Sequence, residues 1–256
     1  MFHLITTSAL VLVLLFAGSA YAQQDDAPWQ EDLSAFLEVL YAEHDNPYFH
    51  TPRAEFELAI ANYRAALPGL SRAERITGFA RLVAMVGDGH TWMPMHRLPF
   101  DGLPPGPVFS SLPIRFVLFD DGLYVVGASH SHADLLGARV TEFGDVPVDD
   151  AVARVMELLP QDATNFAREF VAEWLMQVEL LMALDLVASD QVKLSLRLDG
   201  ESLTADLAAL DVGVMYDWIF STDGGPTGQQ NWQTAAEQQP FWMQAFDGHF
   251  RIAELE

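Results

Sequence analysis

The sequence contains no cysteine and only one lysine, Lys193, among its 256 residues. Without cysteine, the chain can form no disulfide bond, no thiolate metal site and no cysteine nucleophile. It also lacks a Gly-x-Ser-x-Gly motif and a Ser-x-x-Lys pair, two local signatures of a serine nucleophile. Lys193 alternates with apolar neighbours in a strand-like segment, so we expect it to face solvent. A serine–lysine dyad within this sequence is therefore not expected.

Basic residues of any kind are scarce. The sequence has 13 of them against 36 acidic residues, which gives a formal net charge of −23. This charge repels nucleic-acid backbones and anionic membrane surfaces, so nucleic-acid binding is excluded. Half of the residues are hydrophobic, which excludes a disordered chain and provides enough apolar surface for a core. Solubility explains the acidity, and a cationic partner is the alternative explanation.

One apolar run, from Ala9 to Ala17, lies at the start of the chain. A membrane-spanning helix needs roughly 18 or more apolar residues, so this run is too short to span. Ala20-Tyr21-Ala22 follows it and fits the small-x-small rule for signal peptidase. We therefore expect residues 1–22 to be a cleaved signal peptide and the mature chain to begin at Gln23. The mature protein is then periplasmic or secreted and does not span a membrane.

The first part of the mature chain has the periodicity of helices, with an apolar residue at every third or fourth position. The third helix opens with Ser71 and Glu74, which fit a capping box, and it ends before Gly87. Several prolines beyond Gly87 mark an irregular connection. We therefore predict a helical subdomain over residues 23–105. Its helices are expected at residues 31–42, 51–67 and 71–86.

The next part of the chain is rich in β-branched and aromatic residues. Turn sequences at Asp121-Gly122 and Asp199-Gly200 lie between such runs and predict two hairpins. In chain order, we expect a hairpin at 112–127, a strand at 138–143, a helix at 148–159, a long helical stretch at 163–187 and a hairpin at 191–207. Beyond residue 211, only 250–255 has a strand-like pattern. These elements together predict an α+β fold.

The most distinctive polar motif is Gly87-Asp88-Gly89-His90-Thr91, just beyond the third predicted helix. Its glycines permit a tight loop that presents His90. A loop histidine beside a carboxylate can act as a general base. The alternative is a hydrogen-bonded structural histidine in a turn.

His130-Ser131-His132 would place two imidazoles on the same side of an extended segment, as a metal site requires. No second pair of ligands at metal-site spacing accompanies them, which favours a polar loop. We therefore predict neither a metal nor a cofactor. The six tryptophans are interpreted as buried packing residues rather than as ligand-stacking residues. The pattern assigns no role to the isolated histidines His44, His50, His96 and His249.

Taken in order, these segments resemble the tail-specific (C-terminal-processing), tricorn-related serine peptidases of bacteria. The resemblance rests on a helical region ending in Gly-Asp-Gly-His-Thr and followed by the segment from Leu112 to Phe116. Residues 134–140 and 143–148 are similar to the family's PDZ-type stretch, and residues 240–248 to the lead-in to its catalytic core. The resemblance covers nearly all of the mature chain. It implies a helical subdomain at 23–105, a PDZ-like β/α region at 106–210 and a lead-in to an α/β peptidase core at 211–256.

The resemblance implies serine-type hydrolysis of peptides or unfolded proteins. By this resemblance, His90 is the general base for a serine, and Asp88 supports it. The family's serine and oxyanion-hole glycines belong to a core that would follow Glu256, and a base without them cannot carry out acyl transfer. We therefore expect a truncated chain that is inactive alone, or one that works with a separate chain carrying the core.

Two alternatives stay open. The first is a non-catalytic PDZ-like protein, because such a unit captures an extended peptide at a sheet edge and needs no serine. The second is a binder of apolar ligands, because a retinoid-binding protein family shares this ancestry and the chain is rich in Trp and Phe.

Overall fold

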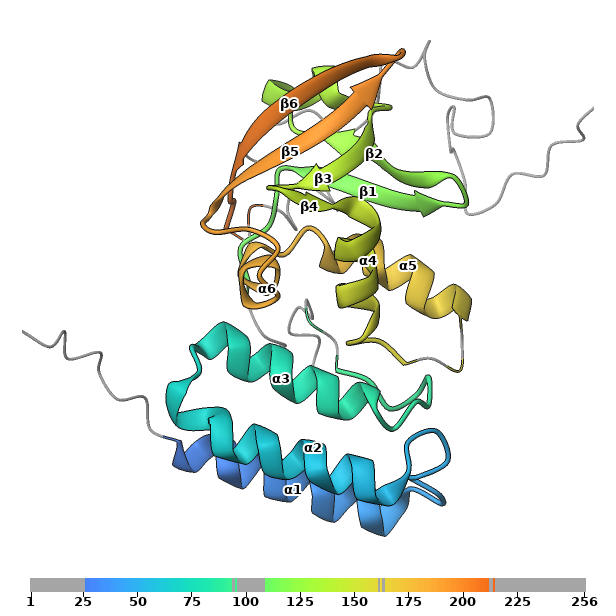
Figure 1. Cartoon of the computed structure of the whole chain (residues 1–256), viewed down its shortest axis with the longest axis vertical. Helices are drawn as coiled ribbons and strands as arrows, with labels where there is room; N and C mark the ends of the chain where they lie inside the picture. Colours follow the sequence, from blue (N-terminus) through green and yellow to red (C-terminus); the bar gives the residue numbers. More distant parts are fainter. Residues whose placement is uncertain are drawn as a thin grey trace, which may run out of the picture.

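The computed structural model describes residues 26–93, 95, 109–160, 162, 164–211 and 214. Within them the chain has the predicted α+β fold, with a helical layer at one end and an antiparallel sheet at the other (Figure 1). The helices are α1 (Ala27–Glu43), α2 (Arg53–Ala66), α3 (Arg72–Ala84), α4 (Val148–Met156), α5 (Thr164–Trp174) and α6 (Val178–Ala183). The strands are β1 (Ile114–Phe119), β2 (Gly122–Ala128), β3 (Arg139–Phe143), β4 (Val146–Pro147), β5 (Gln191–Leu198) and β6 (Glu201–Ala208). Short 3-10 helices occupy Leu67–Gly69 and His130–Leu135.

Several predictions concern residues that the structure does not describe. The expected signal peptide at 1–22 and the strand-like segment at 250–255 lie outside the described residues. Nearly all of the expected lead-in at 211–256 lies outside them too. In the part of the chain that is described, no helix has both the length and the apolar character needed to cross a membrane.

The helical layer consists of α1, α2 and α3. The apolar positions that predicted these helices meet in a small core of their own, where Leu33 and Leu40 of α1 pack with Phe56 and Ile60 of α2. Because an amphipathic helix must bury its apolar stripe against a partner, three such helices in succession form a layer. Figure 1 shows this layer below the rest of the molecule.

Helix α3 joins this layer to the other half of the protein. Its capping box is confirmed, because Ser71 Oγ accepts a hydrogen bond from Glu74 N at 3.3 Å and Ser71 N donates to Glu74 Oε2 at 2.7 Å. Leu82 of α3 belongs to the small helical core, whereas Ile76 and Ala80 belong to the large core that contains the sheet. The same helix therefore contributes to both cores, which fixes the position of the loop that follows it.

The sheet has the strand order β1-β2-β3-β5-β6, with β4 paired to β3, and every pair is antiparallel. Among the described residues, β1 and β6 therefore form its two edges. Both predicted hairpins are confirmed, and the second turns at 199–200 as predicted. The first turns at 120–121, one residue before the predicted Asp121-Gly122, because Gly122 pairs with Phe119 and begins β2. Lys193 is exposed, as its alternation with apolar residues predicted. Its apolar neighbours in β5 are buried, namely Val192, Leu194 and Leu196.

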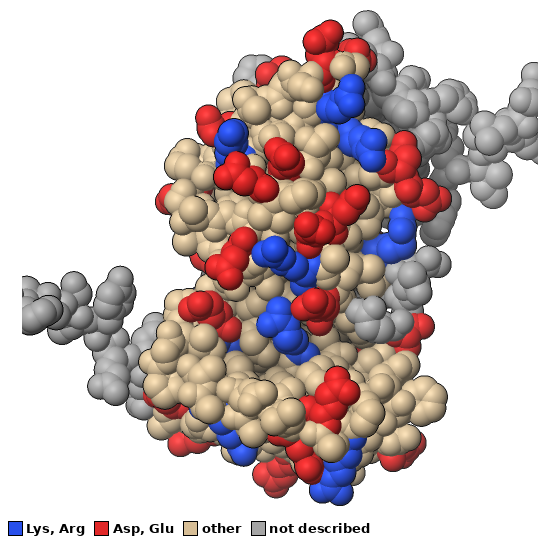
Figure 2. All heavy atoms as spheres, viewed as in Figure 1, with Lys and Arg blue, Asp and Glu red and all other residues tan. Residues whose placement is uncertain are grey.

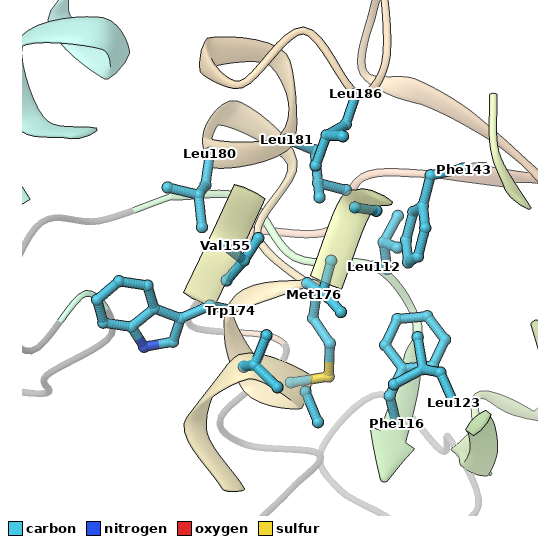
Figure 3. Close-up of a cluster of buried hydrophobic side chains, with 14 of the residues drawn as sticks. Leu112, Phe116, Leu123, Phe143, Val155, Trp174, Met176, Leu180, Leu181 and Leu186 are labelled. Atoms are coloured by element: carbon cyan, nitrogen blue, oxygen red, sulfur yellow. The ribbon is translucent and has the colours of Figure 1, made fainter. Parts of the chain in front are cut away.

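Helices α4, α5 and α6 lie between the sheet and the helical layer (Figure 1). Their apolar side chains meet those of the strands in one buried cluster, part of which Figure 3 shows. Trp174 at the end of α5 is fully buried there, as the packing interpretation of the tryptophans predicted for it. Strand residues Phe116 and Phe143 pack edge to face, with ring centroids 5.7 Å apart.

The helical stretch predicted at 163–187 is divided into α5 and α6. Between them, Met176 O accepts a hydrogen bond from Leu112 N at 2.8 Å, and Val178 N donates to Ser110 O at 2.9 Å. A helix cannot continue where its backbone groups are bonded to another segment, because each group is needed for the helical ladder. The partner segment is distant in the sequence, so the local pattern did not predict the break.

Candidate functional site

The loop that follows α3 carries both of the predicted site residues. Gly87 begins it with φ of +80°, a left-handed conformation that favours glycine. A Cβ at Gly87 would lie 2.4 Å from Cγ of His50, so the packing also requires glycine here. The preceding turn is held by Thr51, whose hydroxyl donates to Met85 O at 2.6 Å. These contacts fasten the loop to the segment between α1 and α2.

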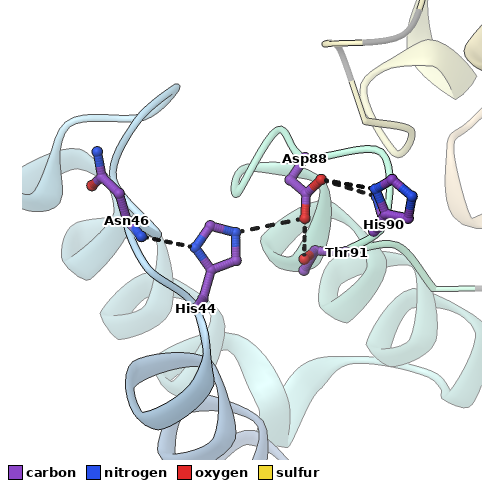
Figure 4. Close-up of polar contacts among 5 residues, drawn as sticks. All are labelled: His44, Asn46, Asp88, His90 and Thr91. Atoms are coloured by element: carbon purple, nitrogen blue, oxygen red, sulfur yellow. Dashed lines mark hydrogen bonds and ion pairs between the residues drawn. The ribbon is translucent and has the colours of Figure 1, made fainter.

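Asp88 organises this loop (Figure 4). Its Oδ1 accepts a hydrogen bond from His90 N at 3.1 Å, and its Oδ2 accepts one from the Thr91 hydroxyl at 2.8 Å. The pKa of Asp88 is lowered below its ordinary value, chiefly by the His90 backbone N–H and further by the Thr91 hydroxyl and the His90 imidazole. Asp88 is therefore an anion at neutral pH.

His90 lies beside Asp88 but is held loosely. Its Nδ1 is 3.5 Å from Asp88 Oδ1, at the long limit for a hydrogen bond, and its side chain is 100 % exposed. Within the described residues, its imidazole contacts Asp88 and no serine. The structure thus brings the two predicted site residues together, and none of the described residues contributes a serine nucleophile beside them.

A second histidine, His44, lies on the other side of Asp88. Its Nε2 is 3.6 Å from Asp88 Oδ2, and its Nδ1 accepts a hydrogen bond from Asn46 N at 3.2 Å. Because Nδ1 is the acceptor, the neutral ring carries its proton on Nε2, which faces the carboxylate. Asp88 therefore lies between two imidazoles, as Figure 4 shows. Sequence reasoning missed His44, since no local pattern links the end of α1 to this loop.

The motif His130-Ser131-His132 lies in a 3-10 helix rather than in a strand. The hydroxyls of Ser129 and Ser131 are 2.8 and 3.0 Å from Nδ1 of His132. These contacts are local, so they favour the polar-loop interpretation for His132. The side chain of His130 lies outside what the structure describes. Among the residues that are described, no group of three side chains could hold a metal ion.

A groove runs between the edge strand β1 and helix α5. It encloses about 340 Å³ and is lined by Arg115, Phe116, Val117, Leu118, Arg168, Glu169, Ala172 and Glu173. Successive side chains of a strand point to opposite faces of the sheet. Residues 115–118 are consecutive, so a groove that all four border must run along the backbone edge of β1 rather than over one face. In the described part of the chain, β1 pairs with β2 alone. The other edge of β1 therefore faces the groove.

Helix α5 runs antiparallel to β1 along this groove. Near the start of α5, Arg168 Nη2 lies 3.0 Å from Oδ1 of Asp120, which follows the end of β1. Just beyond the end of α5, Met176 O is bonded to Leu112 N, which precedes β1. We call the end of the groove near Arg168 its hairpin end. Sequence reasoning missed the groove, because it depends on two segments that only the fold brings together.

Charges are mixed on the face of the molecule that Figure 2 shows. The described basic side chains lie interspersed with acidic ones over this face, and they form no continuous basic surface there.

Comparison with known proteins does not assign this chain to a family, because no family model and no curated protein matches its sequence. The relation to tail-specific peptidases stays a prediction from the motifs. The physical properties of the groove and of the Asp88 loop are therefore the basis for a function.

Proposed function

We propose that this protein binds extended polypeptide segments in the groove between β1 and α5. The observation that carries the proposal is an edge strand whose backbone borders a groove. An edge strand presents backbone N–H and C=O groups, and an extended peptide can pair with them as an additional strand. Binding of this kind needs no nucleophile.

The dimensions and walls of the groove support a peptide as the ligand. Four consecutive residues of β1 line the groove, and at roughly 3.3 Å per residue this stretch is about 13 Å long, enough for a peptide of about four residues. Val117 and Leu118 are half-buried and offer apolar contacts to the side chains of a ligand. Arginine and glutamate side chains also line the groove, which favours a peptide over a purely apolar ligand.

This proposal assigns an activity to the predicted PDZ-like region at 106–210. In the same proposal, residues 1–22 direct the chain out of the cytoplasm, and its ligands are peptides or unfolded proteins in the periplasm or outside the cell. The helix beside the binding edge is α5, which packs against β1.

The test is the binding of fluorescent peptides to the mature chain, residues 23–256, measured by fluorescence anisotropy. A pool of short unstructured peptides identifies a binder, which is then synthesised again with N-methyl groups on alternate residues. N-methylation removes backbone donors and keeps the side chains, so strand addition predicts a loss of affinity of about tenfold or more. Equal affinity for the two peptides would contradict strand addition. A lack of binding by any peptide would contradict the proposed function.

A matched pair of variants locates the site. Glu169 lines the groove, whereas Glu201 is an exposed residue at the start of β6, on the opposite edge of the sheet. Glu169→Trp fills the groove and should weaken binding by about tenfold, and Glu201→Trp removes the same charge and should change it by less than about twofold. Similar effects of the two changes would place the peptide elsewhere.

The Asp88 loop favours a second proposal, serine-type peptidase activity. Because Asp88 Oδ1 lies near Nδ1 of His90, Nε2 of this exposed ring is available to take a proton from a hydroxyl. In this proposal His90 is the general base, Asp88 supports it, and the serine comes from outside the described residues or from a separate chain.

Peptide hydrolysis by the mature chain tests the second proposal. The comparison is with His90→Ala, with His132→Ala as the control histidine, and with labelling by a serine-reactive covalent probe. Turnover that is lost only in His90→Ala, together with labelling, supports the proposal. Equal rates in all three proteins and no labelling contradict a serine within this chain and leave only one that a separate chain supplies.

A further inference from the structure

We infer that the open face of the sheet binds an acidic sugar, whose carboxylate lies between Arg139 and Arg197 and whose hydroxyls fill the hollow beside them. Arg139 of β3 and Arg197 of β5 are exposed, whereas the adjacent Val140 and Leu196 are buried. Successive side chains of a strand point to opposite faces, so both arginines lie on the face away from the core. This site is separate from the groove between β1 and α5.

The two arginines are direct cross-strand partners. The register of β3 and β5 pairs Arg139 with Arg197, which places their Cβ atoms about 5 Å apart on one face, and like charges in this position destabilise a sheet. In the described part of the chain, neither arginine lies within ion-pair distance of a carboxylate. A bound anion replaces their repulsion by two attractions.

The two guanidinium groups lean toward different neighbours. Arg197 Nη2 donates to Gly200 O at 3.2 Å, in the turn of its own hairpin. Arg139 lies against Gly122 of β2, where a Cβ would be 2.5 Å from its Nε. A guanidinium has several N–H donors, and these contacts leave most of them for a ligand. One carboxylate between the two side chains can therefore accept hydrogen bonds from both.

A hollow of about 450 Å³ adjoins this arginine pair, over β3, β5 and β6. Its polar lining combines hydroxyls, which donate and accept, with one carboxylate acceptor and one guanidinium donor. A ligand that matches this lining carries many hydroxyls, as a sugar does. The polar residues are Thr141, Glu142, Ser195, Arg197, Ser202 and Thr204.

Glu142 limits the charge of the ligand. The Ser195 hydroxyl donates to Glu142 Oε2 at 2.8 Å, which holds this carboxylate in the hollow as an acceptor for a sugar hydroxyl. Its negative charge repels a dianion such as phosphate more strongly than a single carboxylate. Tyr124, the cross-strand partner of Arg139, adds an aromatic ring for the apolar face of a sugar. The ligand class is thus a sugar with one carboxylate, a uronate.

NMR titration of the mature chain, residues 23–256, with disaccharides tests this inference. Each of three disaccharides carries one uronate, namely glucuronate, galacturonate or mannuronate, and each is compared with the neutral disaccharide that has a hydroxymethyl group instead. At low salt, at least one uronate should bind about tenfold more tightly than its neutral counterpart, because its carboxylate gains charged hydrogen bonds from two arginines. No preference in any of the pairs overturns the inference.

Inorganic phosphate is the competing probe. If phosphate binds as tightly as the best uronate, the arginine pair is a general anion site, and the choice of a sugar is wrong. Ser202→Ala addresses the same point, because it removes a hydroxyl from the hollow and leaves both arginines. It should weaken the uronate and its neutral counterpart by a similar factor of about threefold. An unchanged affinity for both would show that no sugar occupies the hollow.

Arginine variants test whether both side chains hold the same carboxylate. Arg139→Gln and Arg197→Gln should each lower the preference for the uronate by about fivefold or more, and the double variant should lose little more than either alone. Arg64→Gln removes the same charge from an exposed position in α2 and should keep the preference. Circular dichroism and thermal melting establish that each variant is folded.

A preference that survives both single changes, or that falls equally in Arg64→Gln, overturns the role of the arginine pair. The peptide-binding function proposed above is tested by other ligands on another edge of the sheet. Binding of uronates therefore stands or fails independently of it.

Discussion

At the scale of single residues, Asp88 connects a motif of the sequence to a feature of the fold. It accepts hydrogen bonds from two groups of its own loop and lies within ion-pair distance of two histidines. The motif Gly-Asp-Gly-His-Thr predicted the partners that are close in sequence, His90 and Thr91. The contact with His44 depends on the packing of the segment after α1, which no local pattern reveals.

The lowered pKa of Asp88 predicts how this residue affects stability as the pH changes. The unfolded chain binds the Asp88 proton more readily than the folded protein does, so its stabilising contribution is present above the ordinary value of 3.8 and is lost as the pH falls below it. Asp88→Asn removes this dependence. Between about pH 7 and about pH 3, the wild type should therefore lose more stability than the variant, by less than about 1 kcal/mol because the carboxylate is a third exposed.

Urea unfolding at the two pH values measures this difference. Equal losses of unfolding free energy in the two proteins would show that the hydrogen bonds to Asp88 do not favour its ionised form.

At the scale of elements, most helices and strands follow from local patterns. The capping box of α3, the two hairpins and the strand β3 lie where apolar periodicity and turn residues predicted them. The exception is the break between α5 and α6, where the backbone of residues 110–112 pairs with the backbone of residues 176–178. Tertiary hydrogen bonds outweigh helix propensity there, because propensity differences are only fractions of a kcal/mol per residue.

The capping box predicts the effect of Ser71→Ala. The alanine leaves Glu74 N without its partner at the start of α3, which should lower the free energy of unfolding by about 1 kcal/mol. Ser34→Ala is the matched control. Ser34 lies inside α1, and its hydroxyl donates only to Gln30 O, so alanine there should be neutral or slightly stabilising.

Urea denaturation of both variants gives the comparison. If Ser71→Ala costs no more than Ser34→Ala, the cap does not contribute to the stability of α3.

At the scale of the whole molecule, the excess of acidic residues dominates the electrostatics. Because the net charge is −23, the acidic side chains repel one another, and this repulsion is stronger in the compact folded state than in the unfolded chain. Raising the salt concentration from about 10 mM to about 200 mM shortens the screening distance from roughly 30 Å to roughly 7 Å, and should raise the melting temperature by a few degrees.

Thermal melting in sodium chloride and in potassium chloride measures this effect, and equal shifts in the two salts would identify screening rather than the binding of one ion. A melting temperature that falls with salt would mean that exposed ion pairs, such as Arg53 with Glu57 at 2.7 Å, outweigh the overall repulsion.

The sequence by itself determined the features that depend on neighbours along the chain. These are the α+β class, most of the helices and strands, the turns, the exposed position of Lys193 and the juxtaposition of Asp88 with His90. Only the tertiary structure decided the contact of His44 with Asp88, the break between α5 and α6, and the groove along β1 with Arg168 at its hairpin end. Each of these brings together segments that lie far apart in the chain, and such contacts depend on how whole elements pack rather than on the order of residues within one element.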